Sequence, residues 1–178
     1  MSFSNEVRNE VARYMPDKPC CRKSELAALL VFAGQVDKTA DGQLLKITVE
    51  NAATARKIYQ YVKELSPWPA TVESEQKNRF RKSRAYEVVI EPQEADKAVL
   101  EEMGLFYPTA RRHVPWNLLG KACCRRSFIR GLFLTRGFIN RPEGNYHLEL
   151  VLSDTRLAVE VQKLLQKMGL KAGRIERK

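Results

Sequence analysis

Residues 20–36 read CCRKSELAALLVFAGQV, and residues 123–139 read CCRRSFIRGLFLTRGFI. The two stretches share six identities at a constant offset of 103 residues, where chance gives roughly one. The register continues beyond the match, since Ile47 and Val49 align with Leu150 and Leu152. Apolar positions that stay aligned over about fifty residues indicate an internal repeat. The sequence therefore predicts one fold used twice.

Each copy shows alternating helix and strand patterns. In the first copy, Gly34 and Gly104 end helical patterns, Gly34 as a left-handed C-cap, and Asn51 is the expected N-cap of a middle helix. The pattern predicts an α+β unit of the order αββαββα. Its helices are expected at 22–33, 52–65 and 94–103, its strands at 35–36, 44–50, 70–75 and 80–91, and its first turn at 40–42.

The second copy is incomplete, because it stops at Lys178, the counterpart of Glu75, and so lacks the last strand and helix. Ahead of the first copy, the spacing of Phe3, Val7 and Val11 predicts an amphipathic N-terminal helix. We expect both repeats to form one domain. Its parts are the N-terminal helix (1–17), the first repeat (18–104), a linker rich in Pro and Arg (105–120) and the truncated second repeat (121–178).

The repeated helix carries a small residue inside an apolar stretch, Ala28 in the first copy and Gly131 in the second. A glycine in mid-helix costs about 1 kcal/mol relative to alanine, so close approach of another backbone is the expected reason. We predict that the two helices cross at these residues about a pseudo-two-fold axis. The alternative is that each helix packs only on its own sheet.

The net charge is +10, from 31 Lys and Arg against 21 Asp and Glu, and the computed isoelectric point is about 9.6. This excess favours a polyanion partner, nucleic acid before an anionic membrane surface, with a merely solvated basic surface as the alternative. The longest apolar run, residues 26–33, is far shorter than the roughly 20 residues that span a bilayer. The N-terminus has no signal pattern, so we expect a cytoplasmic protein.

The four cysteines form two adjacent pairs, Cys20 with Cys21 and Cys123 with Cys124. Neighbouring cysteines pair poorly in a disulfide and lack the spacer of a zinc knuckle. We expect buried thiols that act as small hydrophobic side chains. The alternative, metal or redox chemistry, needs ligands gathered from across the chain.

The segments LAALLVFAG (26–34) and IRGLFLTRG (129–137) resemble degenerate copies of the LAGLIDADG motif of homing endonucleases. The doubled Cys-Cys-Arg helices, the MSF start and the segment YHLE (146–149) resemble, over essentially the whole chain, the N-terminal domain of the WhiA family. That family consists of bacterial sporulation and cell-division transcription regulators. The resemblance implies a DNA-binding role, and it implies that a C-terminal helix-turn-helix domain, a candidate site for protein partners, follows. The missing last strand and helix fit a chain that is cut or disordered before its natural end.

In active LAGLIDADG nucleases each motif helix supplies an acid just before its final glycine, and the two acids hold a divalent metal ion. Here those positions hold Ala33 and Arg136. Alanine offers no ligand, and arginine repels a cation. The nearest acids, Asp37, Asp41 and Glu143, are expected to be turn and surface residues. We therefore predict no catalytic residues, no metal, no cofactor and no nuclease activity.

Basic residues are the candidate DNA contacts. One cluster lies on the predicted hairpin formed by the strands at 70–75 and 80–91. Another lies in or beside the linker, and Arg136 could meet a phosphate or pair with a glutamate. The hairpin could instead be a charged edge that prevents strand aggregation. The predicted contacts are Lys77, Arg79, Arg81, Lys82, Arg84, Arg125, Arg126 and Arg136, with Arg111, Arg112 and Lys121 nearby.

Three functions compete. The favoured one is the non-catalytic DNA-binding domain of a transcription regulator, associated with the nucleoid and with DNA as its partner. The second is a protein-interaction scaffold whose DNA binding resides in the helix-turn-helix domain. The third is a metal-dependent endonuclease, which Ala33 and Arg136 oppose.

Overall fold

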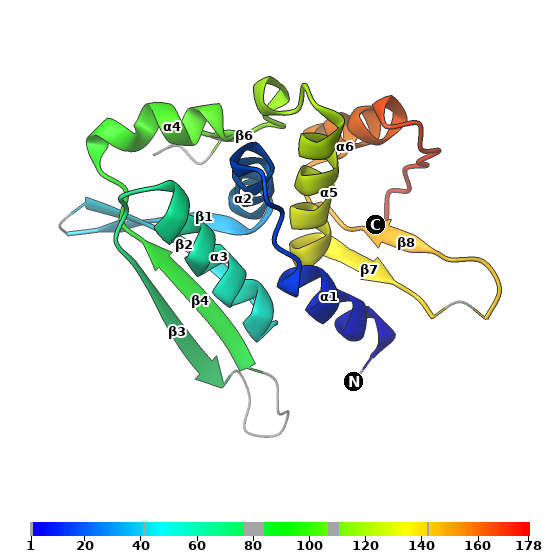
Figure 1. Cartoon of the computed structure of the whole chain (residues 1–178), viewed down its shortest axis with the longest axis horizontal. Helices are drawn as coiled ribbons and strands as arrows, with labels where there is room; N and C mark the ends of the chain where they lie inside the picture. The colour runs from blue at the N-terminus through cyan, green and yellow to red at the C-terminus, as the bar shows by residue number, and fades with distance from the viewer. Residues whose placement is uncertain (1, 41, 77–83, 107–110, 142) are drawn as a thin grey trace.

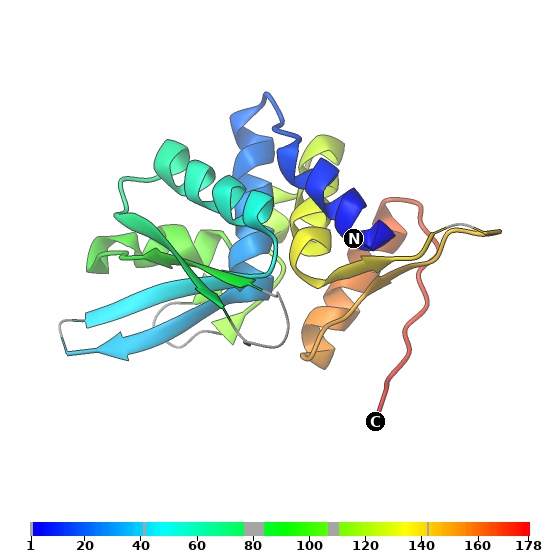
Figure 2. The same ribbon diagram turned by 90° about the horizontal axis from the view of Figure 1, so that it is seen from below.

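The computed structural model describes residues 2–40, 42–76, 84–106, 111–141 and 143–178. Two long helices, α2 (Pro19–Ala33) and α5 (Ala122–Arg136), stand side by side at its centre (Figures 1 and 2). A four-stranded sheet lies on one side of the pair, and a two-stranded sheet lies on the other. This is the predicted α+β class with two pseudo-symmetric repeats.

The first repeat continues from α2 through β1 (Gly34–Thr39), β2 (Gly42–Val49), α3 (Ala52–Leu65), β3 (Ala70–Gln76) and β4 (Arg84–Ile90). The antiparallel strands run in the order β1-β2-β4-β3. Helix α3 begins where predicted, because the Asn51 side chain accepts a hydrogen bond from the Thr54 amide at 2.9 Å. Apolar residues of α3 cover one face of the sheet and form the first core with α2.

A one-turn 3-10 helix, η1 (Glu94–Asp96), leads into α4 (Lys97–Glu102), which closes the first repeat. Gly104 ends this helix with a positive φ of 98°, a conformation that favours glycine. The next segment, predicted as a linker, contains a short hairpin of β5 (Leu105–Phe106) and β6 (Arg111–Arg112) and the 3-10 helix η2 (Trp116–Leu118). Val114 and Leu119 of this segment are buried in the second core.

The second repeat comprises α5, β7 (Gly137–Ile139), β8 (Leu148–Leu150) and α6 (Thr155–Lys167). Asp154 caps α6 at the position that aligns with Asn51. The strand expected at the end of the chain is not formed, since residues 170–178 have no strand structure. In the first repeat β4 lies between β2 and β3. Among the described residues of the second repeat no strand takes the place of β4, so the terminal segment has no strand to pair with.

Gly34 was predicted to be a left-handed C-cap, and this was wrong: its φ is −71°, and the chain passes directly from α2 into β1. Glycine is needed there for space, because a Cβ would lie 2.5 Å from the carbonyl oxygen of Leu30. Gly137 repeats this arrangement, with a φ of −90° and a hypothetical Cβ 2.7 Å from the Phe133 carbonyl oxygen. Both motif helices therefore end in glycine for the same steric reason.

The predicted helix crossing is confirmed. A Cβ added to Gly131 would lie 2.6 Å from the Glu25 carbonyl oxygen and 2.8 Å from the Ala28 Cβ. The two backbones can approach this closely only because position 131 has no side chain. Apolar α2 residues pack on the first repeat on one side and on the second on the other, which explains why 26–31 are buried all round the helix.

A buried polar cluster ties N-terminal helix α1 (Phe3–Arg13), α2, α3 and α5 together. The Glu25 carboxylate forms ion pairs with Lys57 and Arg130 and accepts a hydrogen bond from the Tyr61 hydroxyl at 2.8 Å. Lys57 also donates to the Tyr14 carbonyl at 2.7 Å, just beyond the end of α1. Burial beside this carboxylate raises the pKa of Tyr61, so its hydroxyl stays protonated and donates. The repeats are thus joined by polar as well as apolar contacts.

Candidate nucleic-acid interface

An arginine occupies one of the two helix-end positions at which an active nuclease carries an acid, and Ala33 occupies the other. Arg136 ends α5, and its Nε donates to the Phe32 carbonyl oxygen of the facing helix at 2.9 Å. The sequence left a phosphate or a glutamate as its expected partner. The described partner is instead a backbone carbonyl at the end of α2, in the turn that includes Ala33.

Two more arginines bind the same helix ends. Arg112 of β6 donates to the Val31 carbonyl at 2.8 Å, and Arg8 of α1 donates to the Gly137 carbonyl and stacks on the Phe133 ring. Carbonyls at a helix C-terminus carry partial negative charge, which cations offset. Burial lowers the pKa of both guanidiniums, and for Arg112 nearby Arg136 adds to the effect. These positions therefore present positive charge where a divalent metal ion needs negative ligands.

The described acidic residues nearest to these helix ends in the sequence lie elsewhere, in β1 and in the loop between β7 and β8. Asp37 lies in β1 rather than in a turn, and its carboxylate is 3.2 Å from the Lys46 ammonium of β2. Glu143 is exposed in the loop between β7 and β8. Asp41 lies outside the described residues.

The sheet face away from α3 is acidic, which the order of residues did not reveal. Cross-strand pairing puts Glu73 opposite Glu87, and Lys46 lies between Asp37 and Glu87 with ion pairs to both. Side chains directly opposite each other project from the same face of a sheet. Among the described residues of this face, the acids are Asp37, Glu73, Glu75 and Glu87, and the one cation is Lys46. Such a face repels a DNA backbone.

The described members of the two predicted cationic clusters lie on elements that begin at opposite ends of the molecule. Arg84 is exposed at the start of β4, and Arg126 is exposed in the first turns of α5, which begins at the other end in Figure 1. Arg125 donates to the Leu119 and Gly120 carbonyls, which ties it to the turn before α5. The hairpin residues Lys77, Arg79, Arg81 and Lys82 lie outside the described residues. The described contacts Arg84 and Arg126 therefore do not share one surface, and the full set of contacts stays a prediction.

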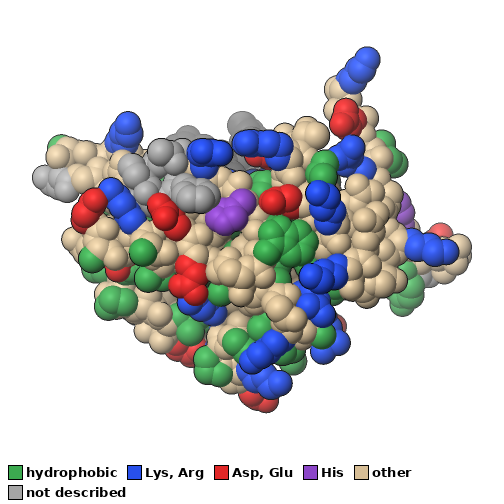
Figure 3. Space-filling model, turned by 90° about the horizontal axis from the view of Figure 1, so that it is seen from above, with side chains coloured by type: hydrophobic (Ala, Val, Ile, Leu, Met, Phe, Trp, Pro, Cys, Tyr) green, Lys and Arg blue, Asp and Glu red, His purple; other side chains and the backbone are tan. Residues whose placement is uncertain are grey.

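The positive charge is divided unequally between the repeats. Residues 1–104 contain 16 Lys and Arg and 16 Asp and Glu, whereas residues 121–178 contain 13 and 5. Figure 3 shows Lys and Arg prevailing over the half that holds α5 and α6, while acids are mixed with them over the other half. Exposed cations of the second repeat that lie outside the predicted set include Lys163, Lys167, Lys171 and Arg174. A charge count for each repeat would have revealed them.

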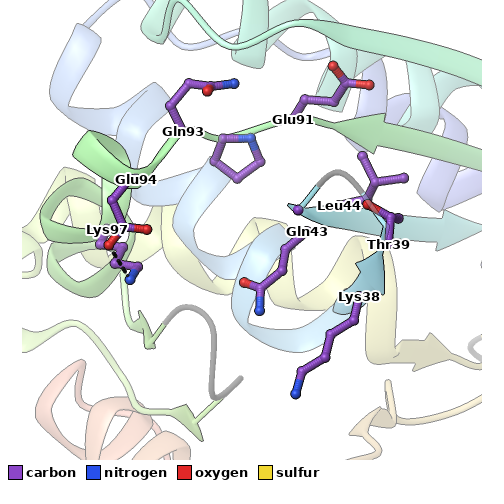
Figure 4. Close-up of a pocket in the computed structure, with 10 residues that line it drawn as sticks. Lys38, Thr39, Gln43, Leu44, Glu91, Gln93, Glu94 and Lys97 are labelled. Carbon is purple, nitrogen blue, oxygen red and sulfur yellow. Dashed lines mark hydrogen bonds and ion pairs between the residues drawn. The ribbon is translucent and has the colours of Figure 1, made fainter.

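An open hollow of about 930 Å³ lies between the β1–β2 hairpin and the segment before α4. Figure 4 shows its lining side chains spread around it, with Glu94 and Lys97 joined in an ion pair. Lys38 and Glu91 contribute one further charge of each sign. Mixed, exposed charges of this kind do not form a set for nucleophilic or acid–base chemistry.

Two glycine-ended helices packed face to face, each followed by an antiparallel sheet, define a LAGLIDADG-type scaffold. Two family models match it: the WhiA N-terminal LAGLIDADG-like domain over residues 19–106 and the WhiA LAGLIDADG-like domain over residues 125–178. The chain belongs to the WhiA family.

Proteins of similar sequence support the same family assignment. The chain is 49% identical to the probable cell division protein WhiA of Syntrophomonas wolfei over its whole length, and 40% identical to that of Desulforudis audaxviator over 96% of its length. It spans 58% and 54% of these two proteins. It therefore corresponds to a little over half of the relatives it matches.

Solved structures show the same fold. The crystal structure of an N-terminal LAGLIDADG domain of WhiA matches 99% of this chain with a TM-score of 0.73, and the chain covers 80% of it at 22% identity. Full-length WhiA from Thermatoga maritima matches 94% with a TM-score of 0.66, and the chain covers 50% of it at 21% identity. Among the described residues, no helix is long and apolar enough to cross a membrane.

Proposed function

We propose that this chain is the non-catalytic DNA-binding part of a bacterial transcription regulator of cell division or sporulation, acting on the nucleoid in the cytoplasm. The relatives' name, cell division protein WhiA, supports the regulatory role. Ala33 and Arg136 at the motif-helix ends support the absence of catalysis, because neither provides a metal ligand.

The observation that carries DNA binding is the charge of the second repeat, 13 Lys and Arg against 5 Asp and Glu. The acidic sheet face of the first repeat makes a DNA contact through that face unfavourable. DNA is therefore expected to lie mainly against the basic surface of α5 and α6, with the segment between β3 and β4 as a further predicted contact. Phosphate contacts of this kind position a protein without reading a base sequence.

A DNA titration over a salt series tests this proposal. Changing Arg126, Lys163 and Lys167 to alanine should weaken binding to every duplex and reduce the slope of log K against log salt by about one unit for each phosphate-binding cation removed. The matched control changes three exposed cations of the first repeat, Lys38, Arg56 and Lys63, and should keep the slope. Equal slopes for the two triple variants would contradict the proposal.

A protein-interaction scaffold is the second candidate, and the acidic sheet face favours it. That face suits a basic protein surface, and DNA would then be bound by a helix-turn-helix domain outside this chain. The same titration separates the two candidates. A folded chain that shows no salt-dependent DNA binding supports the scaffold.

A further inference from the structure

The two cysteine pairs meet across the boundary between the repeats. Cys20 and Cys21 occupy the second and third positions of α2, and Cys123 and Cys124 occupy the same positions of α5. Because the two helices lie side by side, all four Sγ atoms lie within 4.8 Å of one another. All four are free thiols.

We propose that these four cysteines form a mononuclear tetrathiolate zinc site that joins the two repeats. Zinc binds thiolates tetrahedrally at about 2.3 Å, which places the sulfurs about 3.8 Å apart. The observed spacing needs to contract by only about 1 Å at most, a movement within reach of side-chain rotation. Four sulfurs around one point are typical of Zn²⁺, whereas an iron–sulfur cluster distributes its thiolates over several irons and needs a wider cage.

The serines next to the four sulfurs are arranged with the same two-fold symmetry as the sulfurs themselves. Ser127 of α5 lies beside Cys21 of α2, and Ser24 of α2 lies beside Cys124 of α5. Both serines are 1% exposed. Hydrogen bonds from outer residues orient the ligands of metal sites. The shared Cys-Cys-Arg-x-Ser pattern thus places two ligands and one orienting hydroxyl on each helix.

The site can also carry the charge and admit the ion. Four thiolates and Zn²⁺ have a net charge of −2, and the sulfurs lie at two helix N-termini, which favour anions. Neither N-cap residue, Lys18 or Lys121, supplies a side-chain acceptor to the first turn. Cys20 and Cys123 are half-buried while Cys21 and Cys124 are buried, so the ion is enclosed on one side and has an entry path on the other.

Vicinal cysteines lack the spacing of a zinc knuckle, and for this reason the sequence favoured buried thiols and left a metal site as the alternative. The tertiary structure replaces the missing spacer by pairing two helices whose first turns are equivalent. A zinc ion bound here stabilises the contact between the repeats, because it binds the folded arrangement and not the separated helices.

The test uses untagged chain, purified under reducing conditions and loaded with zinc or cobalt. We expect one zinc per chain by elemental analysis. Cobalt should give the thiolate charge-transfer and ligand-field absorption of a tetrahedral site. Binding displaces the thiol protons, so affinity should fall steeply as the pH is lowered.

Changing Cys20 and Cys123 together to serine removes one half-buried ligand from each repeat. Affinity should fall by more than the 10–100-fold typical of losing an outer-shell partner. The control His147→Ala removes the exposed imidazole beside Glu149, an alternative surface site, and should keep the stoichiometry. A chelator should lower the unfolding midpoint of the parent chain and leave that of the double variant unchanged.

Failure of the reduced parent chain to bind zinc or to give the cobalt spectrum would overturn the proposal. Stoichiometric iron in place of zinc, or metal retained by the double variant, would do the same. If the double variant does not fold, the cobalt spectrum of the parent chain decides alone.

Discussion

Gly131 is the residue that allows the two repeats to meet. We predict that Gly131→Ala destabilises the chain, since its Cβ would collide with the Glu25 carbonyl and the Ala28 Cβ on the facing helix. Overpacking costs about 1–3 kcal/mol, and alanine's better helix propensity recovers about 1 kcal/mol. A net loss of about 1–2 kcal/mol should appear in urea unfolding.

Gly120→Ala is the matched control, because a Cβ at that glycine meets no atom within 4 Å. It should change the free energy of unfolding by no more than about 0.5 kcal/mol. Equal stability of the two variants would show that the helix pair adjusts to a larger residue at position 131.

Tyr61 tests the buried cluster around Glu25. Tyr61→Phe removes a hydroxyl that donates to the Glu25 carboxylate at 2.8 Å and leaves the aromatic ring in place. Removing a donor from a buried charged acceptor should lower the free energy of unfolding by about 1–3 kcal/mol. Tyr59→Phe, at a half-buried position of the same helix, should cost less than about 0.5 kcal/mol. If Tyr61→Phe costs no more unfolding free energy than Tyr59→Phe, the ion pairs with Lys57 and Arg130 are enough to stabilise the buried Glu25 carboxylate.

At the scale of elements, the hairpin between β3 and β4 remains a predicted DNA contact. Changing Arg79, Arg81 and Arg84 to alanine should weaken binding to all sequences about equally and flatten the salt slope by about one unit for each phosphate-binding cation removed. The fold should survive, because surface changes usually stay within about 0.5 kcal/mol. Circular dichroism checks the fold, and an unchanged affinity and slope would identify the hairpin as a protected edge.

The two sheets show how an element depends on its neighbours. Residues 70–76 form β3 because β4 offers a hydrogen-bonding partner along its whole length. The equivalent residues near the C-terminus have a similar position in the repeat but no such partner, and they form no strand. Strand propensity alone did not decide the outcome.

For the whole molecule, we predict no DNA cleavage. Supercoiled plasmid incubated with the chain and Mg²⁺ or Mn²⁺ should remain intact on a gel, because arginines and an alanine stand at the helix ends where metal-binding acids are needed. Nicking that co-purifies with the chain and disappears in Asp37→Asn would contradict this prediction.

The repeat, its helices and most strands, and the crossing at Ala28 and Gly131 could be recognised from the order of residues alone. So could the missing acids, because a duplicated pattern and two substituted motif positions are visible along the chain without knowledge of any contact. Local signals such as the Asn51 cap depend on residues three apart and are equally visible there. The conformation of Gly34 was misjudged because its steric reason, the nearby Leu30 carbonyl, depends on how the helix joins the strand.

Which distant residues share a surface could be learned only from the folded chain. Arg136 meets the end of α2, acids from three strands meet on one sheet face, and four cysteines meet at the first turns of α2 and α5. None of these groups is contiguous in the chain, and each forms only when helices and strands pack in one particular arrangement. Charge interactions and ligand geometry depend on distances of a few ångströms, and packing sets those distances between residues that lie up to about a hundred positions apart.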